Sequence, residues 1–451
     1  MRTDRRHFIA LSAAALATAG APPARAATQL SALGVDATQL GVNPASSEDQ
    51  SRPLQRAIDR AAAARVPLVL PPGVYRAANL KLPKGAALAG MRGASRLMLS
   101  DAASLLTAES ADDVVLSGLI LDGGGKRHES RGLVRMSSGR NVRVVDCTFD
   151  SVTNQALLLE GIAGEVRSNT FNAPGDGAIR SLDARDLVIN ANTIRGAGNA
   201  GIQVWRSAAG YDGTIVTENR IEDTRARDGG SGQYGNAINV FRAGNVIVAN
   251  NRIAGAAFSA VRGNAASNIH ILGNDCTRCA EVAIYSEFEY HGAVIANNIV
   301  VGAAFGIALA NFQQGGRLAV VQGNLIRNLT PKRPPGTDPD DAAGIGIGVE
   351  ADVAVTGNVI ENVPNTGISV GWGPYQRDVT VSGNTVRGAA YGITVSVSKD
   401  AGAAAVTGNL IAEVRKGAIV GMDYKNVATG DLAKDGVGRF THLTVSGNHV
   451  R

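Results

Sequence analysis

Eleven asparagines recur at similar intervals along the last two-thirds of the chain, and this repeat limits the fold more than any other feature. Each has an apolar residue three positions before it and another two positions after it, and neighbours are most often 23 to 26 residues apart. A period of this size is typical of a solenoid, in which each repeat buries its apolar face only against adjacent repeats. The asparagines are Asn169, Asn192, Asn219, Asn251, Asn274, Asn298, Asn324, Asn358, Asn384, Asn409 and Asn448.

Each repeat contains two short runs with strand character. One precedes the asparagine, as in Val379–Ser382 before Asn384, and another follows it, as in Gly392–Val395. Apolar residues alternate with small polar ones in these runs, as in a strand whose side chains point to opposite faces in turn. No segment between repeats has a helical period, the leucine framework of a leucine-rich repeat is missing, and a propeller blade needs roughly twice the period. We therefore predict an all-β fold, a single right-handed parallel β-helix of about 13 coils and about 60 Å in length at the usual strand spacing.

The asparagines have a structural role in this prediction. At a bend between strands an Asn tolerates left-handed backbone geometry and can hydrogen-bond nearby main chain. In stacked coils, identical Asn side chains can also bond one another along the axis, which satisfies polar groups that would otherwise be buried unpaired. We expect an asparagine ladder and assign none of these residues to catalysis.

The first 26 residues resemble an export signal. Arg5-Arg6 precede Phe8-Ile9 as in the twin-arginine motif, an Ala/Leu-rich run follows, and Ala24-Arg25-Ala26 offers a cleavage site. The run is too short to anchor the chain in a bilayer. We expect a twin-arginine signal peptide over residues 1–26 and a periplasmic or extracellular protein. The alternative is a basic start followed by an alanine-rich helix.

The net charge of the expected mature chain is small. Without residues 1–26, 40 basic and 38 acidic residues remain. This balance gives no support for nucleic-acid binding, and no other stretch is long enough to cross a membrane.

Three further segments follow the expected signal. Residues 27–47 are polar and without periodicity, which predicts a flexible arm. An N-terminal cap with the first strands is expected over residues 48–100, and the β-helix over residues 101–451. In the cap, Leu54 and Ile58 lie on one face of a predicted amphipathic helix.

Two phrases in the cap carry a resemblance to a known family. Residues 54–62 (Leu-Gln-x-Ala-Ile-Asp-x-Ala-Ala) and residues 70–75 (Leu-Pro-Pro-Gly-Val-Tyr) resemble the N-terminal cap of the pectate lyase-like β-helix superfamily. The resemblance covers nearly all of the mature chain and implies a helix over the open end of the first coil, where a bare strand edge needs a cover. With the twin-arginine signal, the chain is most similar to exported bacterial repeat proteins of this superfamily.

Three inserts interrupt the period, at residues 223–234, 330–341 and 423–438, and all are rich in Gly, Pro and charge. Long loops on a solenoid tend to gather on one side and often wall a binding groove. The last coil ends at Arg451 without a recognisable capping element. This arrangement predicts either end-to-end self-association through the C-terminal coil or its protection by the third insert.

Aligning the strands that follow the asparagines gives two columns of side chains that face outward. The resemblance to the superfamily implies that this sheet holds a saccharide cleft, in which aromatic rings stack on sugars and arginines pair with carboxylates. The alternative is that these side chains are ordinary surface residues of an exposed sheet and bind no ligand. The expected substrate-binding residues are Arg180, Gln203, Trp205, Asn239, Phe241 and Asn264.

The densest group of chemically capable residues is Arg262 with Tyr285, Glu287 and His291. Abstraction of a proton next to a sugar carboxylate needs a base and a cation to hold the developing charge, and these residues could supply both. The segment around His291 faintly resembles a Phe-Asp-Pro-His stretch of alginate epimerases, with Glu289 in place of Asp and Tyr290 in place of Pro. The alternative is solvated surface charge.

Other motifs are weaker. Cys276 and Cys279 form a single Cys-x-x-Cys pair, for which burial as small apolar residues competes with a redox or metal role. The acidic run over residues 338–341 could hold calcium or form a solvated loop, and no cofactor is expected.

The sequence therefore predicts a carbohydrate-active protein that acts on an acidic polysaccharide by lyase or epimerase chemistry. The alternative is a glycan-binding or envelope-associated structural protein without catalysis.

Overall fold

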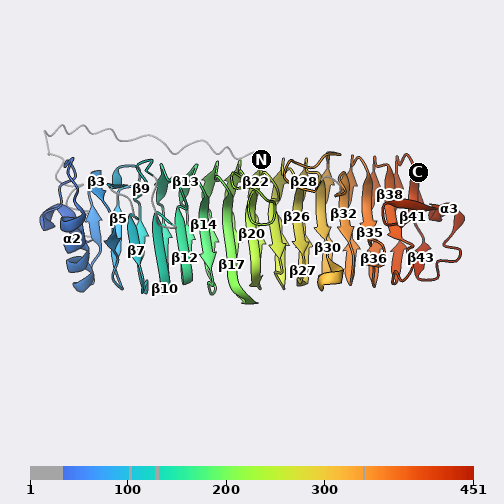
Figure 1. The fold of residues 1–451 in the computed structure, drawn as a ribbon, viewed down its shortest axis with the longest axis horizontal. Helices are drawn as coiled ribbons and strands as arrows, with labels where there is room; N and C mark the ends of the chain where they lie inside the picture. The colour runs from blue at the N-terminus through green and yellow to red at the C-terminus, as the bar shows by residue number, and fades with distance from the viewer. Residues whose placement is uncertain (1–33, 101–103, 127–131, 339–340) are drawn as a thin grey trace, which may run out of the picture.

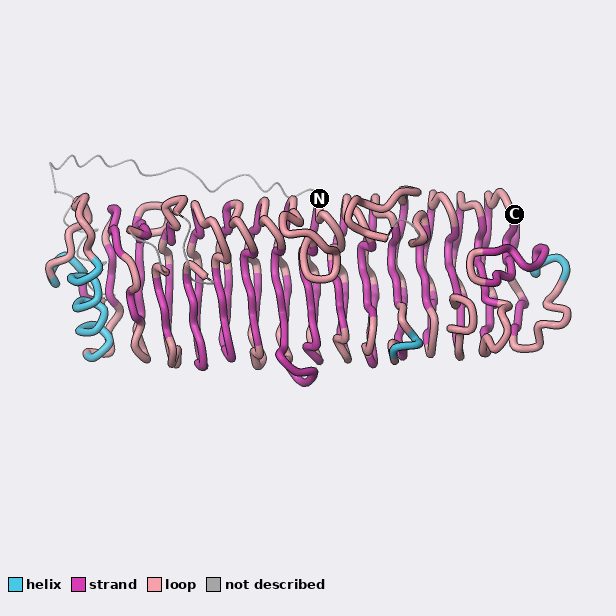
Figure 2. The backbone as a smooth tube through the Cα atoms, viewed as in Figure 1, coloured by secondary structure: helices cyan, strands magenta, loops and turns pink. Residues whose placement is uncertain are grey.

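A computed structural model describes residues 34–100, 104–126, 132–338 and 341–451. The described chain forms one long rod in which short strands cross the axis in every turn (Figures 1 and 2). The strands form three parallel stacks, here called faces 1, 2 and 3, and each coil contributes a strand to each face. This confirms the predicted parallel β-helix. The expected signal peptide lies outside the described residues.

Face 1 holds fourteen stacked strands, one for each coil, which corresponds to a length of about 65 Å at the usual strand spacing. They are β4 (Leu80–Lys81), β7 (Leu106–Ala108), β10 (Val134–Val145), β12 (Leu157–Arg167), β14 (Gly177–Leu182), β17 (Ala200–Tyr211), β20 (Asn236–Gly244), β23 (Val261–Asn264), β26 (Val282–Glu287), β29 (Phe305–Leu309), β32 (Ile345–Val349), β35 (Thr366–Val370), β38 (Tyr391–Ser396) and β41 (Gly417–Asp423).

Face 2 continues from face 1, and β10 and β12 are long enough to belong to both. Its other strands are β2 (Leu68–Leu70), β5 (Ala87–Gly90), β8 (Val115–Ser117), β15 (Val188–Asn190), β18 (Ile215–Thr217), β21 (Ile247–Ala249), β24 (Ile269–Leu272), β27 (His291–Ala296), β30 (Arg317–Gln322), β33 (Val353–Thr356), β36 (Val379–Ser382), β39 (Ala404–Thr407) and β43 (Leu443–Ser446).

Face 3 is a separate sheet of 15 strands. These are β3 (Gly73–Ala77), β6 (Ser95–Leu99), β9 (Ile120–Asp122), β11 (Thr148–Asp150), β13 (Thr170–Asn172), β16 (Thr193–Arg195), β19 (Arg220–Glu222), β22 (Arg252–Ala254), β25 (Asp275–Thr277), β28 (Ile299–Val301), β31 (Leu325–Arg327), β34 (Val359–Glu361), β37 (Thr385–Arg387), β40 (Leu410–Ala412) and β44 (His449–Val450).

The eleven asparagines stack at the corner between faces 2 and 3 and form the predicted ladder. In each rung the backbone N–H and the Nδ2 group donate to Oδ1 of the next asparagine, as from Asn251 to Asn274 at 3.0 and 2.9 Å. The same Nδ2 also donates to a carbonyl of the preceding coil, as from Asn274 to Val248 at 3.0 Å. The ladder satisfies polar groups at a corner where the sheets' own hydrogen bonds stop.

The left-handed residue of this corner is not the asparagine itself, in contrast to the expectation from the sequence. It is the residue just before, such as Gly273 with φ 62° or Asn297 with φ 58°. Glycine is frequent in this preceding position because it adopts positive φ without steric cost.

The interior of the rod is filled by small aliphatic side chains stacked in columns. Ile189, Val216, Val248 and Ile271 are each fully buried in one such column of face 2. Cys147, Cys276 and Cys279 are buried, free thiols, which confirms the apolar interpretation of the Cys-x-x-Cys pair.

The N-terminal end of the rod is covered by α2 (Ser51–Ala63), visible at one end of Figure 1. Its own residues Leu54 and Ile58 are buried, as the amphipathic pattern predicts. Part of the expected flexible arm is ordered, because β1 (Val35–Asp36) pairs with β2 and is followed by the 3-10 helix η1 (Ala37–Leu40).

The third insert forms structure at the opposite end of the rod. Its strand β42 (Asn426–Asp431) pairs antiparallel with β41, and the short helix α3 (Leu432–Asp435) follows. Leu432 is buried in the main core, so this insert protects part of the last coils. No helix among the described residues is both long and apolar enough to span a bilayer.

Replacing Asn274 by Ala should lower the free energy of unfolding by about 2–4 kcal/mol, because two buried donors of Asn251 lose their acceptor. Chemical denaturation followed by circular dichroism measures this loss. The matched control is Asn172→Ala on the exposed side of β13, which should change stability by less than about 0.5 kcal/mol. Equal effects of the two substitutions would show that the ladder contributes little.

Candidate functional site

The register of face 1 confirms the two outward columns predicted from the sequence. Arg180, Gln203, Asn239, Arg262 and Tyr285 are consecutive partners across β14, β17, β20, β23 and β26. The second column runs in the same way through Leu182, Trp205, Phe241, Asn264 and Glu287.

The expected substrate-binding residues at the N-terminal end of the columns bond to one another. Arg180 Nε donates to Gln203 Oε1 at 2.6 Å, and its guanidinium lies over the Trp205 ring at 5.2 Å. Trp205 Nε1 donates to Asn239 Oδ1 at 2.7 Å, and its ring packs edge-on against Phe241. Trp205 and Phe241 remain partly exposed, whereas the side-chain oxygens of Gln203 and Asn239 are already hydrogen-bonded within the protein.

The expected catalytic residues Arg262 and Glu287 form a buried ion pair. Arg262 donates from Nε to Oε1 of Glu287 at 2.7 Å and from Nη2 to Oε2 at 2.9 Å. Asn264 Nδ2 donates to the same carboxylate at 2.9 Å, and the guanidinium lies 4.8 Å from the centre of the Tyr285 ring. Arg262 is only 6% exposed and Glu287 only 2%, so neither presents a free charged group to a substrate.

The first two inserts cover this ion pair. From the first insert, the Ser231 carbonyl accepts from Arg262 Nη1 at 2.8 Å. The second insert brings Arg333 to Glu281, whose other oxygen faces Arg262, with both N–O distances at 3.3 Å. Burial raises the pKa of Glu281, and the neighbouring arginines oppose that rise. The charges therefore hold the two loops against face 1.

His291 is not part of this group. It begins β27 on face 2, is exposed, and is paired in register with Arg317. Phe288, with φ 57°, turns the chain between Glu287 and His291. The structure brings Arg262, Tyr285 and Glu287 together and leaves the imidazole outside the cluster.

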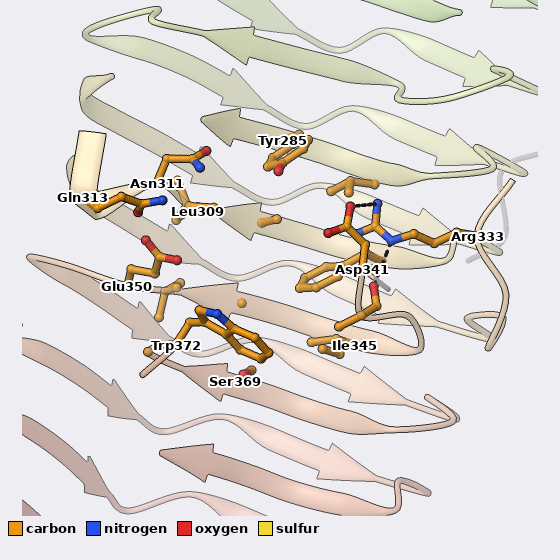
Figure 3. Close-up of a pocket in the computed structure, with 18 residues that line it drawn as sticks. Tyr285, Leu309, Asn311, Gln313, Arg333, Asp341, Ile345, Glu350, Ser369 and Trp372 are labelled. Carbon is orange, nitrogen blue, oxygen red and sulfur yellow. Dashed lines mark hydrogen bonds and ion pairs between the residues drawn. The ribbon is translucent and has the colours of Figure 1, made fainter. Parts of the chain in front are cut away.

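A cleft of about 350 Å³ lies further along face 1, over β26, β29, β32 and β35 (Figure 3). Ala308, Gly348 and Ser369 of the first outward column lie in its floor, and the ring of Phe305 packs over Gly348. Arg333 and Asp341 of the second insert form one wall, where their side chains pair at 3.3 Å. Tyr285 lies at one end and connects the cleft to the buried ion pair.

Glu350 stands in the opposite wall of the cleft, directly after β32 (Figure 3). Burial raises the pKa of its carboxyl to about 7, against the effect of backbone hydrogen bonds from Phe312 and Asn311. The Phe312 N–H donates to Oε2 at 2.6 Å and fixes the carboxyl at the start of the 3-10 helix η2 (Phe312–Gln314). Such a group exchanges a proton near neutral pH.

Two amides and an indole surround Glu350. Asn311 and Gln313 lie on the same side of the cleft, and Trp372 lies beneath them beside Ser369 (Figure 3). Asn311 Oδ1 accepts weakly from the Phe288 N–H at 3.3 Å, which leaves its Nδ2 group available. Trp372 is 45% exposed, a large fraction for an indole. Aromatic rings beside a few polar groups are typical of ligand sites.

The outward columns that were aligned from the sequence did not include Glu350, because the alignment omitted the coil that contains β32. Residues 344–350 read Gly-Ile-Gly-Ile-Gly-Val-Glu, so either Gly-Ile phrase could be aligned with the other coils. The structure pairs Ile347 with Ile307 and Ile368, which turns Gly348 outward and places Glu350 beyond the strand. The small residues of the later coils, which gave no sign of a site, form the floor of the cleft.

Comparisons with known proteins agree with the fold. A family profile described as "Right handed beta helix region" matches residues 164–326. No curated protein sequence matches the chain. The family match and the three stacked faces both identify the fold as a right-handed parallel β-helix, which is the fold that the resemblance to the pectate lyase-like superfamily implied.

Several solved structures share this architecture at low identity. The pre-mature gene product 12 of bacteriophage phi29 aligns with a TM-score of 0.52 and 15% identity over 90% of this chain, which spans only 58% of the phage protein. PfbA, a surface adhesin of Streptococcus pneumoniae, aligns with a TM-score of 0.51 and 15% identity over 88% of this chain and 96% of the adhesin. The A-module of the mannuronan C-5 epimerase AlgE6 from Azotobacter vinelandii aligns at 0.46 and 16% identity over 92% and 99%. These likenesses concern the fold alone.

The described residues include no group of three or more His, Cys, Asp or Glu side chains that is placed to hold a metal ion. Of the acidic run over residues 338–341, the structure describes Asp338 and Asp341, and Asp341 pairs with Arg333.

Replacing Glu287 by Ala should lower the free energy of unfolding by about 3–5 kcal/mol, because Arg262 then remains buried without its main partner. The double variant Arg262→Met/Glu287→Leu should recover much of this loss, and chemical denaturation measures both changes. The control is Glu413→Ala, in an exposed pair with Arg387, with an expected loss below about 1 kcal/mol. A fully stable Glu287→Ala protein would contradict the structural role of the pair.

Proposed function

We propose that the protein binds an acidic glycan in the cleft on face 1 and that Glu350 acts on it as an acid–base group, in lyase or epimerase chemistry. The observation that supports this most directly is a carboxyl with a pKa of about 7 in a cleft that also offers an exposed indole and two side-chain amides. A general base works best when its pKa lies near the operating pH, and enzymes raise the pKa of a Glu to this range by burial.

The proposed reaction begins at the carbon next to the uronate carboxyl group. The Glu350 carboxylate takes the proton from this carbon, and the electron pair left behind spreads onto the sugar carboxylate. Asn311 and Gln313 can donate N–H groups to that carboxylate as its charge grows. If the electron pair expels the neighbouring glycosidic oxygen, the protonated Glu350 or a solvent water gives that oxygen a proton, and the chain is cleaved by elimination. If a solvent water instead gives a proton to the carbon from the other face of the sugar, the residue is epimerised, and Glu350 later releases its proton to solvent.

Trp372 supplies the apolar contact for the sugar ring, since a pyranose presents a face of C–H groups that packs on an aromatic ring. Its position beside Ser369 puts such a ring over the small residues of the floor (Figure 3). Arg262 and Glu287 support the site from below the inserts in this proposal, and do not contact the substrate. Trp205 and Phe241 offer further partly exposed rings on the same face.

Export by the twin-arginine pathway belongs to the same proposal, because polymeric uronates occur outside the cytoplasm. The prediction of export rests on residues 1–26. The alternative function, glycan binding without catalysis, shares the cleft and differs only in the role of Glu350.

The substitution Glu350→Gln should abolish turnover of acidic polysaccharides, with a loss of at least about 100-fold in kcat, because the amide cannot accept the proton. Polygalacturonate and alginate are suitable substrates. Ultraviolet absorbance detects the unsaturated product of elimination, and nuclear magnetic resonance in heavy water detects deuterium introduced by epimerisation.

The control variant is Glu289→Gln, which changes an exposed carboxyl on the turn between β26 and β27 and should keep full activity. Binding of these polymers by a wild-type protein that neither cleaves nor epimerises them would favour the non-catalytic alternative. Absence of both binding and turnover across a wide panel of uronate polymers would contradict the proposal.

The pH dependence of kcat should show a rising limb with its midpoint near 7. The raised pKa keeps Glu350 protonated and inactive as a base below this value, and ionised and active above it. Steady-state rates between pH 5 and 9, on the substrate that the wild type turns over, measure this limb. A rate that falls as the pH rises through 7 would show that the protonated carboxyl is the active form.

A further inference from the structure

We infer that Tyr424, at the tip of the β41–β42 hairpin, forms with Trp372 a second sugar subsite that extends the cleft toward the C-terminal end of the rod. This inference rests on the proposed function, because it names where the next residue of the same glycan chain binds. Tyr424 is not among the residues that line the cleft, and no role was predicted for it from the sequence.

The third insert brings Tyr424 back over earlier coils. β41 belongs to the coil two steps after that of β35, so the tip must reach about 10 Å along the axis to meet the turn that follows β35. The hairpin turns at Tyr424 and Lys425, where Met422 faces Val427 and Asp423 faces Asn426 across the two strands. Ser398 Oγ donates to Asp423 at 2.5 Å and ties the hairpin to the preceding coil.

The turn that carries Trp372 is shaped to receive this tip. Trp372 and Tyr375 exchange backbone hydrogen bonds at 3.3 and 3.1 Å, which fixes a tight turn. Between them, Gly373 adopts φ +58°, and a Cβ atom there would collide with the Tyr424 ring. A glycine is therefore needed both for the backbone conformation and for the close approach of Tyr424.

The two rings meet edge to face and leave an open surface. Their centroids are 5.6 Å apart and their planes are inclined by 83°. Trp372 and Tyr424 are each 45% exposed, and Val427 on the same hairpin is 53% exposed. An aromatic pair that is rigidly held yet exposed is unusual for a purely structural contact, since burial would stabilise it more.

The position of the pair favours a sugar as its occupant. Trp372 belongs to both the cleft and the pair, so the aromatic surface is continuous with the site of Glu350 (Figure 3). The axial step between coils is about 4.8 Å, close to the length of one pyranose in an extended chain. A glycan that lies along the axis with one ring beside Glu350 thus brings a following ring to Tyr424.

The test measures binding of oligouronates of two to eight residues, from both pectate and alginate, by isothermal titration calorimetry. All proteins carry Glu350→Gln, so that the ligands are not consumed. We expect Tyr424→Ala to weaken binding of the oligomers by about 3- to 10-fold, the range typical of one aromatic contact, and to leave unaffected the binding of a single uronic acid, measured alongside them as the shortest length. Tyr424→Phe should bind like the parent because the ring remains.

Tyr211→Ala is a matched control, because Tyr211 is 57% exposed at the end of β17 and makes no contact with the cleft. Equal affinities of the parent and Tyr424→Ala at every length would overturn the subsite and leave the proposed function intact. A uniform loss at all lengths would also overturn it, since it would indicate a general disturbance of Trp372. Failure of the parent itself to bind any oligomer would count against the proposed function and the subsite together.

Discussion

The hydrogen bonds of the asparagine ladder set the geometry on which the rest of the molecule depends. Because each rung receives both a backbone N–H and an Nδ2 group from the preceding asparagine, consecutive coils are held at one axial spacing and in one register. Residues more than 20 positions apart, such as Arg262 and Glu287, thereby become direct neighbours. The ladder requires only that each coil place its asparagine at the corner between faces 2 and 3. The number of residues between successive asparagines can therefore vary. The steps of 32, 34 and 39 residues use this freedom, and the bonds across them are as short as elsewhere.

The inserts convert a regular rod into one with a site. The first two fold over face 1, and their contacts with Arg262 and Glu281 replace water around charges that would otherwise be exposed. Burying such a pair costs desolvation energy, which only good geometry and additional hydrogen bonds offset. The burial fixes the position of the second insert, which then forms a wall of the cleft opposite Glu350. The cleft thus lies where the second insert meets the small residues of the sheet.

The fold could be predicted from the sequence because its signals are local and repeated. The asparagine phrase, the alternating runs and the Leu54/Ile58 pattern each report a contact with an adjacent coil or cap, and the structure confirms them. The outward columns were also predictable, since strand registers follow from the repeat. The burial of Arg262 was not, because it depends on how an insert without any repeat folds over the sheet. Glu350 was missed for a different reason, as its glycine-isoleucine strand fits two registers equally well. The roles of these residues in binding or catalysis remain predictions.

The stacking of coils also has a consequence for how such a site can change over evolution. A coil could be added between those of β32 and β35 without altering the interior of its neighbours, because the interior of each coil packs on the adjacent coils. Glu350 and the Trp372 turn, which lie on adjacent coils, would then move apart by about 4.8 Å for each added coil. Under the proposed function, the length of the bound glycan would then be selected in increments of one coil, and side-chain substitutions would adjust the fit within each increment.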